Sequence, residues 1–197
     1  MTIEEFHQYA KRKEKELERL YNDILPVKVG AIAKRHFQDN FRKGGFVDGG
    51  LTPWPATRRQ QSGGKSAASR YGPLLSGRTH LMRSVRDVPG QARVTIVSDL
   101  PYSRIHNEGG TIETHPTVTP RMRRFAWAKF FEAGGGGKKG ADVPADAVRW
   151  KKLALTRKAK LDIRARIQQR RFIGQSRELG ERIAEKIVEE TRRVISG

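Results

Sequence analysis

The chain of 197 residues contains no cysteine. This absence excludes disulfide bonds, thiolate catalysis and zinc sites built on cysteine. The chain also lacks a run of about 18 apolar residues, the length that a membrane-spanning helix needs. Its opening stretch, Met1–Phe6, has neither the basic start nor the apolar run of a secretion signal. We therefore expect a protein that does not cross a membrane.

Apolar residues are scarce throughout the chain. They make up 36% of it, and the mean hydropathy is −0.69. A chain of this length can form one domain with a core, or one domain with arms. We expect a single domain with a modest core and long polar segments.

Acidic residues are scarce in the middle of the chain. Residues 34–110 carry 13 basic and 5 acidic side chains, and residues 121–171 carry 16 and 4. The ends, 1–33 and 172–197, are balanced, so the middle supplies the net charge of +19. Such a field favours a polyanionic partner: nucleic acid, an acidic membrane or an acidic protein surface.

Residues 1–43 predict a helical hairpin. Thr2 and Glu5 form a capping box, and apolar residues follow at helical spacing. Pro26 is expected to stop the first helix and to open the second, which Gly44 ends. Residues 44–73 are rich in Gly, Ser, Arg, Gln and Pro, and we expect them to form an extended loop or arm.

The remaining residues predict helices packed with a small antiparallel sheet, so the expected fold class is α+β. Residues 74–132 are interpreted as a helix–strand–turn core, 133–144 as a flexible basic loop, and 145–197 as a helix, a strand and a closing helix. Finer expectations are a helix over 74–85, a turn at 87–90, a strand over 91–98, helices over 121–132 and 145–158, and a strand over 161–168. The closing helix is expected to begin at Ser176 and to carry the pair Lys186–Glu190 on its exposed face.

The stretch from Tyr102 to Ile112 holds the residues that come nearest to a reactive site. His106, Glu108 and His115 could together hold a metal, as a metal-dependent nuclease would require. Their spacing lacks the i,i+4 pattern of helical ligands, and no close Asp completes the set. We favour a structural role, in which Gly109 and Gly110 take positive φ and reverse the chain between the strand at 91–98 and the segment from Thr111.

Other catalytic motifs are incomplete. Ser62–Ser66 ends like a phosphate-binding loop, but Arg59 stands where that loop needs a glycine. No Gly-x-Ser-x-Gly is present for a hydrolase elbow, and paired carboxylates are scarce in the basic middle. We therefore expect no enzymatic activity, no metal and no cofactor.

Basic and aromatic residues interleave over 121–131 and around Trp150, a pattern typical of proteins that attract a nucleic-acid backbone and stack bases. We place the aromatic residues in the core and the cations toward a partner. No zinc finger, homeodomain or RNA-binding signature is present, so nucleic-acid binding is expected to be non-specific. The candidate DNA-facing residues are Arg121, Arg123, Arg124, Lys138, Lys139, Lys151, Lys152 and Lys158.

Three segments carry a family resemblance. Their sequences are Leu-Ser-Gly-Arg-Thr-His-Leu-Met-Arg-Ser-Val over 75–85, Tyr-Ser-Arg-Ile-His-Asn-Glu-Gly-Gly-Thr-Ile over 102–112 and Ile-Gln-Gln-Arg-Arg-Phe-Ile-Gly-Gln-Ser-Arg-Glu-Leu over 167–179. In this order they resemble the L-x-x-[ST]-G-x-L-x-x-S, Y-A-x-I-H-x-x-G and I-P-A-R-x-F-L-G-x-S motifs of the phage virion morphogenesis family, which has Mu-like members. The residues that carry the resemblance are Leu75, Gly77, Ser84, Tyr102, Ile105, His106, Asn107, Gly109, Gly110, Arg171, Phe172, Gly174 and Ser176.

The resemblance implies a structural protein of the phage neck, active in tail completion and head–tail joining, and located in the virion after assembly in the host cytoplasm. Its partners would be copies of itself in a ring, the connector or neck proteins, and the tail-terminator or tail-tube proteins. A ring with a basic interior would suit packaged double-stranded DNA, which the charge distribution also favours. The alternative is a non-specific nucleic-acid-binding protein that forms no ring.

Overall fold

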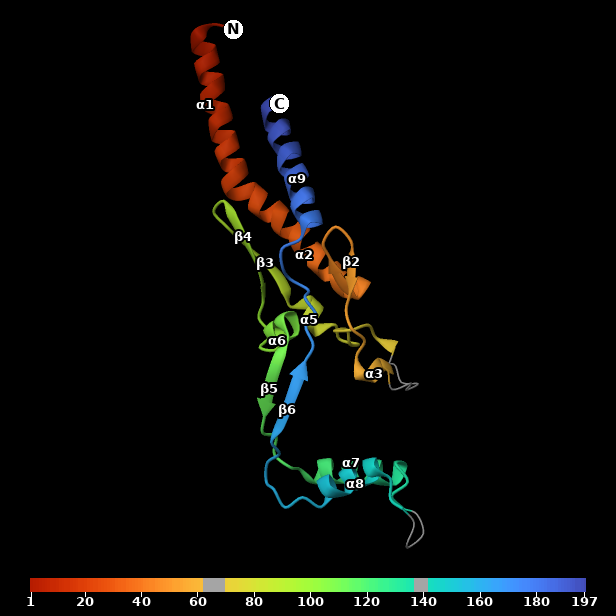
Figure 1. Cartoon of the computed structure of the whole chain (residues 1–197). Coiled ribbons are helices and arrows are strands. Elements are labelled where there is room, and N and C mark those ends of the chain that lie inside the picture. The colour runs from red at the N-terminus through yellow and green to blue at the C-terminus, as the bar shows by residue number, and fades with distance from the viewer. Residues whose placement is uncertain (62–69, 137–141) are drawn as a thin grey trace. The chain divides into compact units, whose positions relative to one another are not determined.

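The computed structural model describes residues 1–61, 70–136 and 142–197 (Figure 1). Contacts divide the chain into two compact units, Met1–Gly110 with Ile167–Gly197, and Thr111–Arg166, and each is described by itself. In the described ranges, helices accompany small two-stranded sheets, with a long helix at the N-terminus and another helix at the C-terminus. The expected α+β class is thus confirmed. No helix in these ranges is both long and apolar enough to cross a membrane.

The first unit holds most of the elements. They are α1 (Ile3–Arg19), the π-helix η1 (Leu20–Ile24), α2 (Leu25–Lys43), β1 (Gly45–Val47), β2 (Leu51–Pro53), α3 (Arg58–Gln61), α5 (His80–Arg83), β3 (Val85–Gly90), β4 (Arg93–Ser98), α6 (Ser103–Glu108) and α9 (Arg177–Ser196). The capping box is confirmed, since the Glu5 N–H donates to Thr2 Oγ1 (3.2 Å) and the Thr2 N–H donates to Glu5 Oε2 (2.7 Å).

The predicted hairpin over 1–43 is wrong, because α1, η1 and α2 form one continuous helix. Pro26 does not break it. Proline has no N–H and crowds the carbonyl four residues earlier, which here belongs to Asn22. The π-helical turn changes the bonding at this point, with the Leu25 N–H donating to the Leu20 carbonyl. The Asn22 carbonyl instead accepts a hydrogen bond from the Ala92 N–H (3.1 Å), so a distant hairpin tip replaces the missing donor.

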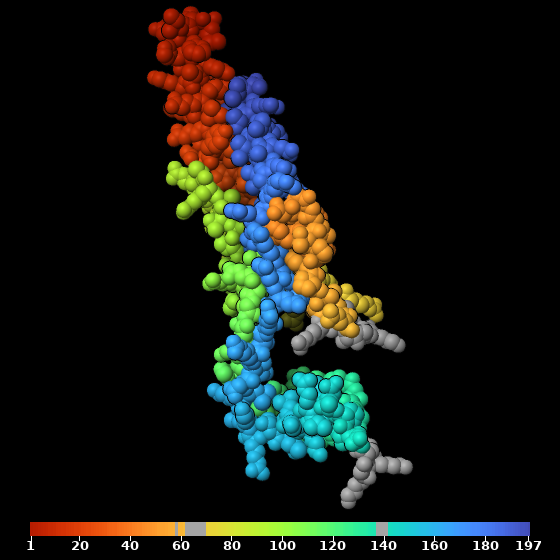
Figure 2. Space-filling model, viewed as in Figure 1, coloured from red at the N-terminus to blue at the C-terminus, as the bar shows by residue number. Residues whose placement is uncertain are grey.

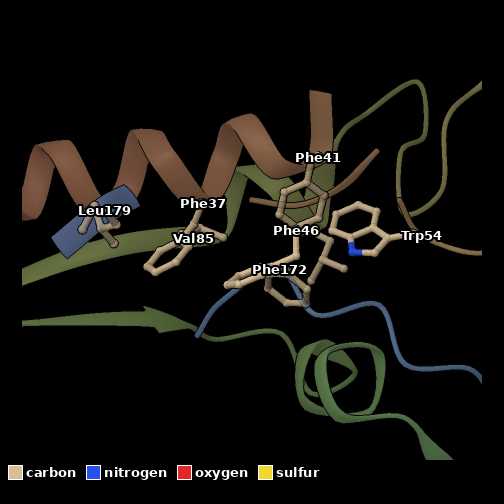
Figure 3. Close-up of a cluster of buried hydrophobic side chains, with 9 residues drawn as sticks. Phe37, Phe41, Phe46, Trp54, Val85, Phe172 and Leu179 are labelled. Atoms are coloured by element: carbon tan, nitrogen blue, oxygen red, sulfur yellow. The ribbon is translucent and has the colours of Figure 1, made fainter. Parts of the chain in front are cut away.

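The predicted loop or arm over 44–73 is wrong for its first part. Strands β1 and β2 pair antiparallel, with Phe46 opposite Thr52. Phe46, Val47 and Trp54 are buried. Phe46 and Trp54 join residues of α2, α5 and α9 in the core. There the Phe41 and Trp54 rings meet edge to face, with their centroids 5.6 Å apart (Figure 3). Strands of three residues between glycines give too short a pattern to read. Residues 62–69, with Lys65 of the incomplete phosphate-loop motif, lie outside the described ranges.

The predicted turn at 87–90 is also wrong. These residues belong to β3, which pairs antiparallel with β4 from Val85 opposite Ser98 to Gly90 opposite Arg93. The turn lies at Gln91 and Ala92, and Ala92 takes a positive φ of 50°. The hairpin lies close against α2, because an added Cβ at Gly30 would come 2.9 Å from Val94 Cγ2. Leu81 and Val85 are buried and Met82 is partly buried, but α5 is only four residues long, much shorter than the helix predicted over 74–85.

Helix α9 begins as predicted, with Ser176 Oγ accepting from the Leu179 N–H (3.2 Å). The expected exposure of the Lys186–Glu190 pair is wrong, because only 4% of Glu190 is exposed. Its carboxylate lies 2.6 Å from Lys28 Nζ of α2 and 2.9 Å from Lys186 Nζ. Arg193 lies 3.5 Å away on the other carboxylate oxygen. This cluster joins α9 to α2.

The second unit contains β5 (Gly110–Thr114), α7 (Pro120–Glu132), α8 (Ala145–Ala154) and β6 (Ile163–Ile167), and the two end strands carry one residue each of the first unit. Strands β5 and β6 form a two-stranded sheet and run in opposite directions (Figure 1). Helices α7 and α8 pack on each other around the buried Ala126, Phe130 and Ala147. These helices and β6 were expected, with α8 and β6 shorter than predicted. Residues 137–141 of the expected basic loop lie outside the described ranges.

Replacing Glu190 by Gln tests the ion-pair cluster. Hydrogen bonds from Lys28 and Lys186 lower the pKa of Glu190 from its usual 4.5 to about 2. The ionised carboxylate therefore stabilises the fold above pH 4.5. This contribution is lost as the pH falls from 4.5 to about 2. We expect Glu190→Gln to have a lower melting temperature than the wild type at pH 7, with the difference shrinking toward pH 2.

Calorimetry at a series of pH values measures both curves. Glu181→Gln, at an exposed position of the same helix, is the matched control and should follow the wild type. A constant difference between Glu190→Gln and the wild type would contradict the assigned pKa.

Candidate functional site

The 170–173 segment, which leads from β6 to α9, lies in the core without joining a sheet. Phe172 is buried, and its ring centroid lies 4.9 Å from that of Phe41 (Figure 3). Buried backbone N–H and C=O groups need hydrogen-bond partners. Because no neighbouring strand supplies them here, side chains must do so.

Two asparagines supply these partners. Asn107 Oδ1 of α6 accepts from the N–H groups of Phe172 (2.8 Å) and Ile173 (3.0 Å). Asn40 of α2 is fully buried and donates from Nδ2 to the Phe172 carbonyl (3.2 Å). Asn40 Oδ1 also accepts from the Val47 N–H of β1 (3.2 Å). The 170–173 segment is thereby fixed directly to α6 and α2, and Asn40 joins it to β1.

Two further hydrogen bonds complete the attachment. The Arg170 N–H donates to the His106 carbonyl (2.8 Å). Trp54 Nε1 donates to the Arg171 carbonyl (2.8 Å). The second and third motif segments are therefore interlocked, although more than 60 positions separate Asn107 from Phe172.

The Tyr102–Ile112 stretch is more than the predicted reversal between the strand at 91–98 and the segment from Thr111. Residues 103–108 form α6, and the two glycines end this helix. The predicted positive φ is confirmed at Gly109 (73°) and Gly110 (135°). Gly109 also has ψ near −175°, a combination that is essentially confined to glycine. An added Cβ at Gly109 would lie 2.9 Å from the backbone nitrogen of Gln169, so the glycine permits this close approach.

The first two motif segments and Arg170 surround a pocket of about 460 Å³. Among the described residues that line it, the polar ones are mainly cations and imidazoles, and none is acidic. The lining includes Arg59, Leu75, His80, Tyr102, His106 and Arg170. The pocket belongs entirely to the first unit.

Burial and neighbouring positive charges lower the pKa values of two residues that line this pocket. Burial, with the charge of Arg170, lowers the pKa of His106 and favours its neutral form. Burial, with the charge of Arg59, lowers the pKa of Arg170. The Arg170 guanidinium donates from Nε (3.1 Å) and Nη2 (3.0 Å) to the Pro55 carbonyl. A lining of this kind suits an acidic group better than a metal ion.

The structure does not assemble the three residues of the metal alternative. Glu108 pairs with Arg104 (2.9 Å), and His115 Nδ1 lies 2.9 Å from Asp162 Oδ1. Among the residues described, no group of three His, Asp or Glu side chains is placed to hold a metal.

The other motif residues also belong to the first unit. Ser84 Oγ donates to the Leu81 carbonyl (2.8 Å) and lies 2.7 Å from Ser98 Oγ. The Arg171 guanidinium lies 4.6 Å from the centroid of the Phe46 ring. Ile105 contacts Gly110, Gly77 lies in the turn before α5, Gly174 lies in the bend before α9, and Ser176 caps α9.

Sequence reasoning missed Asn40, Trp54 and Arg170. Asn40 had a readable signal, because a polar residue stands between Phe37 and Phe41 on the apolar stripe of α2. Trp54 lies in a composition that suggested a loop. Arg170 stands beside Arg171, and nothing in the sequence distinguishes one from the other.

The candidate DNA-facing residues fall into three groups. Arg121, Arg124, Lys151 and Lys152 are exposed. Arg123 Nη1 instead donates to the Ala154 (3.1 Å) and Thr156 (2.6 Å) carbonyls at the end of α8, and Lys158 pairs with Asp162 (3.2 Å). Lys138 and Lys139 lie outside the described ranges.

Comparison of the chain with protein-family models, curated proteins and solved structures found no match.

Replacing Asn107 by Ala should destabilise the first unit. The change leaves the N–H groups of Phe172 and Ile173 without their acceptor, at a cost of about 1–3 kcal/mol for each donor that stays buried. Urea denaturation measures the loss. Asn107→Asp is the matched control, since it keeps an acceptor oxygen and should retain most of the stability. Equal stability of Asn107→Ala and the wild type would show that the two hydrogen bonds to Asn107 are dispensable for stability.

Gly109 and Gly180 should respond in opposite ways to alanine. Gly109→Ala forces Cβ against the Gln169 backbone and into a strained φ and ψ, which costs about 1–3 kcal/mol. Gly180 lies within α9 with open space around its Cα, so Gly180→Ala should stabilise the helix by about 1 kcal/mol. Thermal denaturation compares the two variants, and a Gly109→Ala variant as stable as Gly180→Ala would contradict the close approach.

Proposed function

We propose that the protein is a structural subunit of the phage neck and tail end, which acts in tail completion and head–tail joining as part of a homo-oligomeric ring. One observation carries this proposal. The segments that resemble the virion morphogenesis motifs lie far apart in the sequence, yet Asn107 binds the backbone of Phe172 and Ile173 directly. The motif segments follow each other in the family's order, and the second and third of them also contact each other in the fold. The two observations together support the resemblance better than sequence similarity alone.

The chemistry of the cluster also supports a structural role. Asn40, Asn107 and Trp54 all use their polar atoms to bind the backbone. Groups engaged in this way hold the chain in position. Ring subunits need such rigid positioning, because small errors in one subunit accumulate around a closed ring.

Non-specific nucleic-acid binding is the second candidate, and the surface of α7 favours it. Phe125 and Phe131 are 55% and 59% exposed, contrary to the expectation that these aromatic residues face the core. Arg121 and Arg124 are exposed on the same helix. Exposed aromatic rings beside cations suit the stacking of bases and the neutralisation of phosphates. Within the proposed ring, this surface would face packaged DNA.

The proposed function is tested in the phage that encodes the protein. A mutant that lacks the protein should yield filled heads and tails that fail to join, as seen by electron microscopy, and supplying the protein in trans should restore joined particles. Normal joined particles in the mutant would refute the proposal.

Light scattering and DNA binding separate the two candidates. The ring proposal predicts a defined multimer in size-exclusion chromatography with light scattering. A stable monomer that binds duplex DNA tightly, with affinity falling steeply as salt rises, would instead support the second candidate. The double variant Arg121→Glu, Arg124→Glu should weaken DNA binding and leave the multimer intact.

A further inference from the structure

The pocket of about 460 Å³ in the first unit collects positive charge without a counter-charge. Arg59, Arg170, His80 and His106 all line it, and none of its described lining residues is acidic. Residues 62–69, which follow α3, contain no Asp or Glu. That stretch of the chain therefore cannot supply a carboxylate either. We call this site the cationic pocket.

Arg170 is the residue whose placement most needs an explanation, because only 8% of it is exposed. Its Nε and Nη2 donate to the Pro55 carbonyl, and Nη2 also lies 3.5 Å from Gln168 Oε1. Figure 2 shows the orange segment around residues 45–60 lying against the blue segment that leads to α9. The third guanidinium nitrogen, Nη1, donates to none of the described residues.

A carbonyl can be satisfied by a neutral donor, so the contact with Pro55 does not require a charge. A buried charge is costly unless an opposite charge meets it. Among the described residues, no carboxylate pairs with Arg170, and the charge that acts on it is the positive one of Arg59. The buried guanidinium therefore indicates an anionic partner from outside the chain.

His106 supports the same conclusion from the other side of the pocket lining. Its Nδ1 is buried and has no hydrogen-bond partner among the described residues. Burial and the charge of Arg170 lower its pKa, and no described carboxylate acts against them. An anion bound beside Arg170 would offset the positive charge and favour the protonated imidazole.

The remaining lining determines what kind of acid fits. Leu74, Leu75 and Leu81 also line the pocket; Leu81 is buried and the other two are partly buried. The volume lies in the usual range of small-ligand pockets, roughly 300–1,000 Å³. Leucines beside cations suit an acidic group carried on an apolar body. A duplex phosphate suits them less, because its neighbours along the backbone are further charged phosphates.

We propose that the cationic pocket binds an acidic side chain of a partner protein together with an adjacent apolar side chain. The carboxylate pairs with Arg170 beside Arg59, and the apolar side chain packs on Leu74 and Leu75. The inference goes beyond the proposed function. The pocket lies within one unit of one chain, so its test requires no ring.

Two short peptides test the recognition of the acid. The peptide acetyl-Leu-Glu-Leu-amide is titrated into the intact protein, and nuclear magnetic resonance follows the imidazole signals of His106. Acetyl-Leu-Gln-Leu-amide is the matched probe, since it differs only in having an amide in place of the carboxylate. We expect the Glu peptide to bind about tenfold more tightly or better, because a charge-assisted contact replaces a neutral one.

The pH dependence gives a second signature. Binding of the Glu peptide should raise the pKa of His106, so the complex holds more protons than the free protein. The affinity should therefore increase as the pH falls from about 8 toward about 5.5, while the Glu side chain stays ionised. His80 of α5 lines the same pocket and is followed separately, whereas Arg59 and Arg170 keep their charge throughout.

Charge reversal at the pocket locates the binding. His80 is exposed, so His80→Glu should fold normally and weaken binding of the Glu peptide about tenfold or more, because like charges then meet. Arg83→Glu, at an exposed position of the same helix outside the described lining, is the control and should bind like the wild type. Arg170→Gln should abolish binding. Circular dichroism checks the fold, and if Arg170→Gln is unfolded, His80→Glu decides.

Four results would overturn the proposal. The first is equal binding of the two peptides, or no binding of either. The second is an unchanged pKa of His106 in the complex. The third is full binding by His80→Glu, which would place the peptide elsewhere. The fourth is tighter binding of inorganic phosphate than of the Glu peptide, which would assign the pocket to a phosphate-bearing ligand. All four leave the proposed function standing, since the phage mutant tests that separately.

Discussion

A buried backbone segment that belongs to no sheet is the constraint on which the first unit depends. The 170–173 segment exposes its N–H and C=O groups to the core, and a buried polar group without a partner is costly. Asn107 accepts from the Phe172 and Ile173 N–H groups, and Asn40 donates to the Phe172 carbonyl. The same two side chains therefore determine where α6 and β1 lie relative to α2. The aromatic core of Phe41, Trp54 and Phe172 forms around this arrangement.

The elements that could be predicted are those whose signals are local. The capping box at Thr2, the cap at Ser176 and the helix over 120–132 each depend on residues a few positions apart. The errors occurred where the outcome depends on a distant partner. Pro26 can remain inside a helix because Ala92, far along the chain, bonds the Asn22 carbonyl. Residues 87–90 form a strand because β4 pairs with them.

The candidate site likewise combines features that could be predicted from the sequence with features that could not. Gly109 and Gly110 were identified from the backbone freedom of glycine alone, and their positive φ is confirmed. That Asn107 binds the backbone of Phe172, and that Arg170 reaches the pocket beside His106, could not be read from sequence, since neither pair has a spacing that marks it. For Glu190, a clear local spacing led to a wrong prediction. Its spacing from Lys186 indicated an exposed pair, but Lys28 from another helix encloses it.

The π-helical turn at Leu20–Ile24 also sets the rotational phase of the long helix. A π turn holds one residue more than an α turn, and each residue of an α-helix turns the chain by about 100°. Tyr9 and Lys13 on α1, and Lys28 on α2, face α9 together with this extra residue in place. Without it, α1 would be rotated by roughly a quarter turn against α2. The number of residues between the two halves, as much as their identity, thus decides which side of α1 meets its partners.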